Sequence, residues 1–138
     1  MVGPGTGGDS GGVTAPSESP ADPADLGARR ATEYLALLEE GRTDDAEALL
    51  AGLTDARELV FVGAGFTAMA RRAGRTLPTA MRAQASTRQV LLGQLRDASR
   101  RDPDGLRRWL REAGEEVRTV EQLAEAARRR LGEQAAVS

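Results

Sequence analysis

Apolar side chains recur every three or four residues along most of the chain after residue 22. The first such stretch runs from about Pro23 to Glu40, and a second, shorter one lies between Asp44 and Leu53. This spacing places the apolar groups on one face of an α-helix. Gly41 separates the two stretches. The pattern therefore predicts two helices joined by a tight turn.

The most apolar stretch lies near the middle of the chain. From Leu59 to Ala70 nearly every residue is apolar or small, so the pattern has no polar face. Thr54 or Asp55 is a suitable N-cap, and Gly74 a suitable stop after two arginines. A run of this length falls short of the roughly 20 residues needed to span a bilayer. We therefore predict a central core helix from about Asp55 to Ala73.

Further helices are predicted after this central one. Residues 74–101 carry a weaker apolar stripe, and Ser86 with Gln89 offers an internal capping box, so one helix or two are possible here. The pair Asp102 and Pro103 begins another helix, which Gly114 is expected to end. A last helix is predicted over 119–132, and no alternating strand pattern of useful length is present.

These elements predict an all-α fold, a small bundle of five to six helices around a central apolar helix. We expect a disordered Gly/Pro/Ser-rich leader over residues 1–22, a single helical domain over 23–132 and a frayed tail over 133–138. No secretory or transit signal is evident, which favours a cytoplasmic location. Apart from the central helix, the expected core consists of Leu49, Leu50, Leu53, Leu91, Leu92, Leu95, Leu106, Trp109, Leu110, Leu123 and Leu131.

Composition removes most catalytic chemistry. The chain contains no His, Cys or Lys, and all 19 basic residues are Arg. Thiol nucleophiles, imidazole bases, lysine Schiff bases and metal sites built on His or Cys are therefore excluded. No pair of acids lies on an apolar helix face, where a carboxylate metal site would need it. We expect a protein that is not an enzyme and has no metal and no cofactor.

One short motif offers an alternative. The run Leu59–Val62 followed by Gly63, Gly65 and Ala68 resembles the strand and glycine turn of a dinucleotide-binding fold. That resemblance implies a nucleotide cofactor bound at this GAGFTA stretch. The fold also requires an acidic residue about 20 positions later, yet no Asp or Glu occurs between Glu58 and Asp97. A continuous core helix is the interpretation we favour.

The arrangement of charge is more informative than its total. The net charge is only −2, but residues 59–96 contain six arginines and no acid. These arginines form the candidate interaction surface, Arg71, Arg72, Arg75, Arg82, Arg88 and Arg96. They could pair with the acidic residues of the preceding helical hairpin, contact a protein partner, or bind phosphates of a nucleic acid.

The sequence accordingly predicts a non-enzymatic protein-interaction or regulatory module with no membrane contact. A protein partner or self-association is the first expectation, and a nucleic-acid-binding accessory factor that uses the arginines of 71–96 is the alternative.

Overall fold

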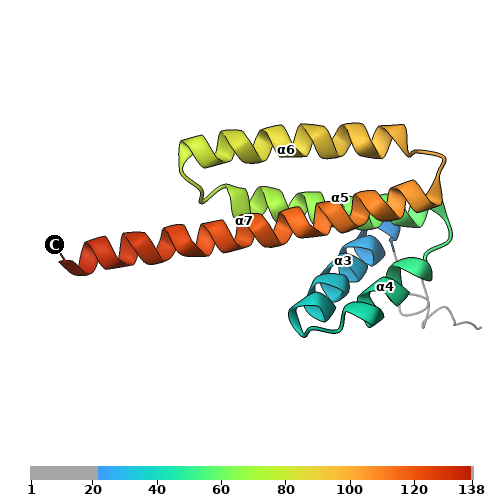
Figure 1. The fold of residues 1–138 in the computed structure, drawn as a ribbon, viewed down its shortest axis with the longest axis horizontal. Helices are drawn as coiled ribbons and strands as arrows, with labels where there is room; N and C mark the ends of the chain where they lie inside the picture. Colours follow the sequence, from blue (N-terminus) through green and yellow to red (C-terminus); the bar gives the residue numbers. More distant parts are fainter. Residues whose placement is uncertain (1–21, 138) are drawn as a thin grey trace, which may run out of the picture.

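The computed structural model describes residues 22–137 (Figure 1). The predicted disordered leader, residues 1–22, lies outside this range except for Asp22. The described residues form five α-helices: α3 (Pro23–Glu39), α4 (Thr43–Ala51), α5 (Ala56–Gly74), α6 (Thr79–Ala98) and α7 (Pro103–Val137). The predicted all-α fold is confirmed.

Local signals set most of the helix starts. The carboxylate of Asp22 accepts a hydrogen bond from the backbone N–H of Ala24 and caps α3, while Asp55 accepts one from Arg57 and caps α5. Each cap satisfies a backbone donor that the first helical turn leaves unpaired. Gly41, at φ 75°, makes the turn between α3 and α4. These starts and this turn agree with the sequence pattern.

Helix α5 is the centre of the bundle and lies between α3 and α7. Leu59, Val62 and Phe66 are completely buried along it. The helices approach closely because α5 carries glycines at the contacts. A Cβ on Gly63 would stand 1.9 Å from Cη2 of Trp109 on α7, and one on Gly65 would stand 3.0 Å from Cβ of Ala31 on α3. The predicted central helix is therefore correct.

Helix α7 is a single helix where the sequence predicted two. The prediction that Gly114 ends a helix was wrong, and so was the predicted end at Gly132, because α7 continues to Val137. A glycine inside a helix costs only about 1 kcal/mol relative to alanine. Gly114 offsets that cost by admitting the ring of Tyr34, since a Cβ there would lie 3.1 Å from its Cε2 atom. Figure 1 shows the C-terminal end of α7 extending beyond the other helices.

Helix α6 differs from the others because none of its residues is fully buried. It is one helix, which settles the choice left open for residues 74–101. Leu92 and Leu95 pack partly against the main core, as expected. Leu91 was wrongly placed in the predicted core, since it is 58% exposed, and Leu131 on α7 was wrong in the same way at 65%.

The helices also bear on two alternatives, a membrane span and a dinucleotide-binding turn. None of those formed by residues 22–137 combines the length and the apolar character needed to cross a membrane. Residues 59–62 lie within α5, so the strand that a dinucleotide-binding turn requires is not formed there.

Candidate binding groove

The six candidate arginines do not share one environment. Arg71 and Arg72 lie on the last turn of α5, Arg75 is the C-cap residue that follows it, and Arg82, Arg88 and Arg96 lie on α6. Within the described part of the chain, two of the six make ion pairs, and both are on α6. The Nε atom of Arg88 lies 2.8 Å from Glu116 on α7, and that of Arg96 lies 3.1 Å from the adjacent Asp97.

The remaining four arginines have no carboxylate partner among residues 22–137. Arg82 only donates a hydrogen bond to the hydroxyl of Thr79, at 3.3 Å. Arg71 and Arg75 are one helical turn apart, where like charges repel each other. Arg72 lines a separate hollow with Glu121 of α7, without an ion pair between the two. Positive charge at the end of α5 is therefore left uncompensated by neighbouring side chains.

The acidic hairpin does not supply the missing partners. Glu47 on α4 pairs instead with Arg111 on α7, with 2.8 Å between its Oε1 atom and a guanidinium nitrogen. The Nε atom of Arg111 also donates hydrogen bonds of 3.0 Å to both carboxylate oxygens of Glu47, and this hydrogen bonding raises the pKa of Arg111. Asp45 and Glu40 pair with Arg42 beside them. Internal pairing between the hairpin and the arginines of 71–96, one of the three alternatives, is absent from the described residues.

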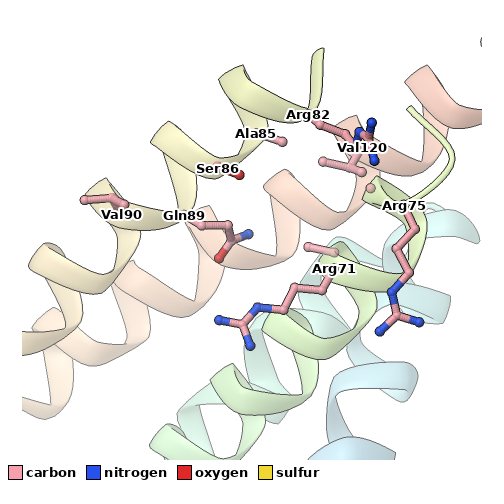
Figure 2. Close-up of a pocket in the computed structure, with 10 residues that line it drawn as sticks. Arg71, Arg75, Arg82, Ala85, Ser86, Gln89, Val90 and Val120 are labelled. Atoms are coloured by element: carbon pink, nitrogen blue, oxygen red, sulfur yellow. The ribbon is translucent and has the colours of Figure 1, made fainter. Parts of the chain in front are cut away.

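Three of the arginines surround a hollow between α5, α6 and α7 (Figure 2). Its volume is about 430 Å³. In Figure 2, Arg71 and Arg75 extend from α5, Arg82 extends from α6, and Gln89 points from α6 towards the α5 side. The complete lining is Ala70, Arg71, Gly74, Arg75, Arg82, Ala85, Ser86, Gln89, Val90 and Val120. No acidic residue belongs to it.

A second, smaller hollow adjoins the first and is lined by the same three helices. It has a volume of about 170 Å³ and shares Arg71 and Gln89 with the first hollow. Phe66, Leu92 and Trp109 also border it, but Phe66 is fully buried and Trp109 is only 3% exposed, so its accessible surface is mainly polar. Arg96 and Thr67 complete its polar part. We call the two hollows together the α5–α6 groove, and the smaller one its inner hollow.

Outside the groove, an ion pair joins α6 to α7. The side chain of Glu116 is only 8% exposed, and both of its oxygens accept a hydrogen bond from Nε of Arg88, at 2.8 and 2.9 Å. A buried carboxylate requires such a partner. Arg88 therefore holds α6 in place and is not available in the groove.

The arginines were predicted from the sequence, but the inner hollow beside them was not. Phe66 and Trp109 were assigned to helix faces, and nothing in their spacing showed that they would border one hollow. Gln89 was noted only as a capping residue. Gly93, in the middle of α6, also borders the inner hollow, and the sequence alone gives no signal of this position.

Other kinds of site find less support. Residues 22–137 contain no group of three or more acidic residues that could hold a metal ion. No family model matches the chain, and neither a characterised protein nor a solved structure matches it.

Proposed function

We propose that the protein is a non-enzymatic protein-interaction module that binds an acidic segment of a partner protein in the α5–α6 groove. The observation that carries this proposal is the set of three arginines, Arg71, Arg75 and Arg82, which border a groove without any acidic residue. Guanidinium groups bind carboxylates through paired, charge-assisted hydrogen bonds. An acidic segment would supply the missing negative charge.

The composition of α6 supports a protein partner. Between Ala83 and Leu95 its only charged residue is Arg88, which is already paired with Glu116. Val90, which borders the groove, is 60% exposed. Protein interfaces are depleted of charge at their centre and carry a polar rim. The edge of the groove formed by α6 has this character.

A nucleic acid fits the groove less well. Proteins that bind single strands usually offer exposed aromatic faces for base stacking. Here Phe66 is fully buried and Trp109 is 3% exposed, so neither ring offers such a face.

A second copy of the chain is also a weaker candidate. In a two-fold symmetric contact through this groove, each copy would bring the same arginines into the interface. Their like charges would oppose association.

The proposal can be tested with labelled peptides. Fluorescence anisotropy would measure binding of a peptide rich in Asp and Glu, a peptide of the same length rich in Ser and Gly, and a short DNA duplex. We expect the acidic peptide to bind and the neutral peptide not to bind. Replacement of both Arg71 and Arg75 by Ala should weaken acidic-peptide binding at least about tenfold, the scale of one or two charge-assisted hydrogen bonds.

Arg29→Ala is the matched control, because Arg29 is exposed on α3 and outside the groove. It should leave the affinity unchanged. Absence of binding to the acidic peptide, or equal effects of Arg29→Ala and the double variant, would refute the proposal. DNA binding that is stronger than peptide binding and falls steeply with added salt would favour the nucleic-acid alternative instead.

A further inference from the structure

The two walls of the α5–α6 groove differ in chemistry. The end of α5 presents Arg71 and Arg75, and the facing part of α6 presents Arg82, Ser86 and Gln89. In Figure 2, Gln89 points from α6 towards Arg71, while Arg75 lies at the same end of the groove as Arg82. A ligand in the groove therefore meets cations on one side and, beyond Arg82, neutral hydrogen-bonding groups on the other.

The neutral groups have no partner inside the described fold. Neither Ser86 nor Gln89 makes a side-chain hydrogen bond to another of residues 22–137. The amide of Gln89 carries one carbonyl acceptor and two N–H donors, and the hydroxyl of Ser86 can donate and accept. A carboxylate only accepts hydrogen bonds, so it leaves the acceptors of this wall unused. A peptide group offers both an N–H and a C=O and satisfies both kinds of group.

The spacing on both walls matches an extended peptide. Arg71 and Arg75 are one helical turn apart, and so are Ser86 and Gln89, which places the members of each pair about 5–6 Å from each other. In an extended segment, side chains two residues apart share one side at a spacing of about 6.6–6.8 Å, and their backbone groups face the same edge. Acidic side chains at alternate positions can therefore meet both arginines while the backbone meets both neutral groups.

A helical segment would satisfy only one of the two walls. Acids four positions apart on its surface could also meet Arg71 and Arg75. Its backbone N–H and C=O groups, however, would be paired within its own helix, so Ser86 and Gln89 would stay without partners. The neutral wall is what distinguishes the two conformations.

We infer that the acidic segment lies extended in the α5–α6 groove, with its backbone hydrogen-bonded to Ser86 and Gln89 and with acidic side chains at alternate positions paired with Arg71 and Arg75. This inference rests on the proposed function and adds the conformation and the sequence pattern of the partner, in which every second residue is Asp or Glu. Gln89 is then the residue that selects a peptide backbone over a polyanion without amide groups.

Two peptides of identical composition separate spacing from charge. In the first, Glu and Ser alternate over eight residues. In the second, the same residues form Glu-Glu-Ser-Ser repeats, which place acids four positions apart, as on one face of a helix. Fluorescence anisotropy should show that the alternating peptide binds about tenfold or more tightly, the scale of one charge-assisted hydrogen bond. Replacement of both Arg71 and Arg75 by Ala should remove this difference.

Gln89→Ala tests the contact with the backbone. It should weaken binding of the alternating peptide about three- to tenfold, the scale of one neutral hydrogen bond. Gln94→Ala is the matched control, because Gln94 is exposed on the same helix and lies outside the groove. It should leave the affinity unchanged, and circular dichroism would verify that both variants keep their helix content.

N-methylation of the peptide distinguishes a lost hydrogen bond from a disturbed groove. One version of the alternating peptide would be methylated on the backbone nitrogens of its Ser residues and another on those of its Glu residues, because only one of these sets faces α6. One version should bind the unmodified protein more weakly than the other. The difference between them should shrink in Gln89→Ala and persist in Gln94→Ala.

The two proposals fail differently. If the two isomeric peptides bind equally well, if the two methylated versions bind alike, or if Gln89→Ala and Gln94→Ala have the same effect, the extended arrangement is refuted while the acidic-segment proposal stands. Tighter binding of the Glu-Glu-Ser-Ser peptide would indicate a helical segment and would also refute the extended arrangement. If neither acidic peptide binds, both proposals are refuted.

Discussion

At the scale of single residues, glycine does the most to shape this bundle. Gly27 on α3 allows the backbone of Phe61 to come so near that a Cβ would stand 2.5 Å from its carbonyl oxygen. Gly63 allows the ring of Trp109 on α7 to come equally near, and Gly65 allows the close approach of α3. Because these contacts involve backbone or rigid rings, they cannot relax around an added methyl group. The close spacing of α3, α5 and α7 depends on them.

Gly63→Ala should destabilise the protein even though alanine is the better helix former. The added methyl group would overlap the six-membered ring of Trp109, which is itself enclosed by the core. Overpacking of this kind costs about 1–3 kcal/mol. Urea unfolding followed by circular dichroism would measure the loss. Gly132→Ala, in open space on α7, should be neutral or stabilising by up to about 1 kcal/mol, and an equal loss in both variants would contradict this account.

The glycines also show why residue patterns can mislead. Gly63, Gly65 and Ala68 stand at the spacing of a phosphate-binding turn, and the same spacing on a helix places small residues against neighbouring helices. Only the surrounding segments distinguish the two. Here the cap at Asp55 and the absence of a downstream acid pointed correctly to a helix.

At the scale of elements, α6 is the least firmly attached helix. It has no fully buried residue, and its attachment relies on partly buried leucines and the ion pair between Arg88 and Glu116. Local opening is easiest where few apolar contacts must break. Helix α6 should therefore exchange its amide hydrogens faster than α5.

Arg88→Ala should loosen this attachment. It would leave the carboxylate of Glu116, 8% exposed, without its partner, and an unsatisfied buried polar group costs about 1–3 kcal/mol. Hydrogen exchange should show faster exchange across α6, and urea unfolding should show the loss of stability. Arg96→Ala, which breaks only an exposed pair with Asp97, should change stability by less than about 1 kcal/mol. Similar effects of the two variants would show that the pair with Glu116 does not hold α6.

The number of helices was harder to predict than their existence. Helix-forming stretches were recognisable because apolar spacing is a local property. Whether Gly114 ends a helix depends on what packs against it, and here Tyr34 and Phe66 fill the space beside it. The groove could not be predicted for the same reason, since Arg71, Gln89 and Trp109 meet only through the packing of three helices.

At the scale of the whole molecule, the charges divide between two ends of the fold. Asp45 and Glu47 of α4 pair with Arg42 and Arg111, whereas the arginines at the end of α5 stay without carboxylate partners among the described residues. Total charge conceals this division, because the net value is only −2.

Global stability should depend on pH in the alkaline range through Tyr34. Burial, and then the negative charge of Glu47, raise the pKa of this phenol above its ordinary value of 10.0. A raised pKa in the folded state contributes stability that is complete below pH 10 and is lost as pH rises through the folded-state pKa. Denaturation midpoints should therefore fall above pH 10.

Tyr34→Phe keeps the ring against Phe66 and should remove this part of the fall. Because Tyr34 is the only tyrosine, tyrosinate absorbance reports its titration directly. An ordinary pKa in the folded protein, or an unchanged pH profile in the variant, would contradict this assignment.

The lack of buried residues in α6 has a consequence for how the chain folds. The contacts that exclude water join α3, α4, α5 and α7, so the transition state can form while α6 is still an unstructured loop that connects two docked helices. Closing such a loop costs little, because the entropy penalty grows only slowly with loop length. Substitutions along α6 would then alter the rate of unfolding and leave the rate of folding almost unchanged.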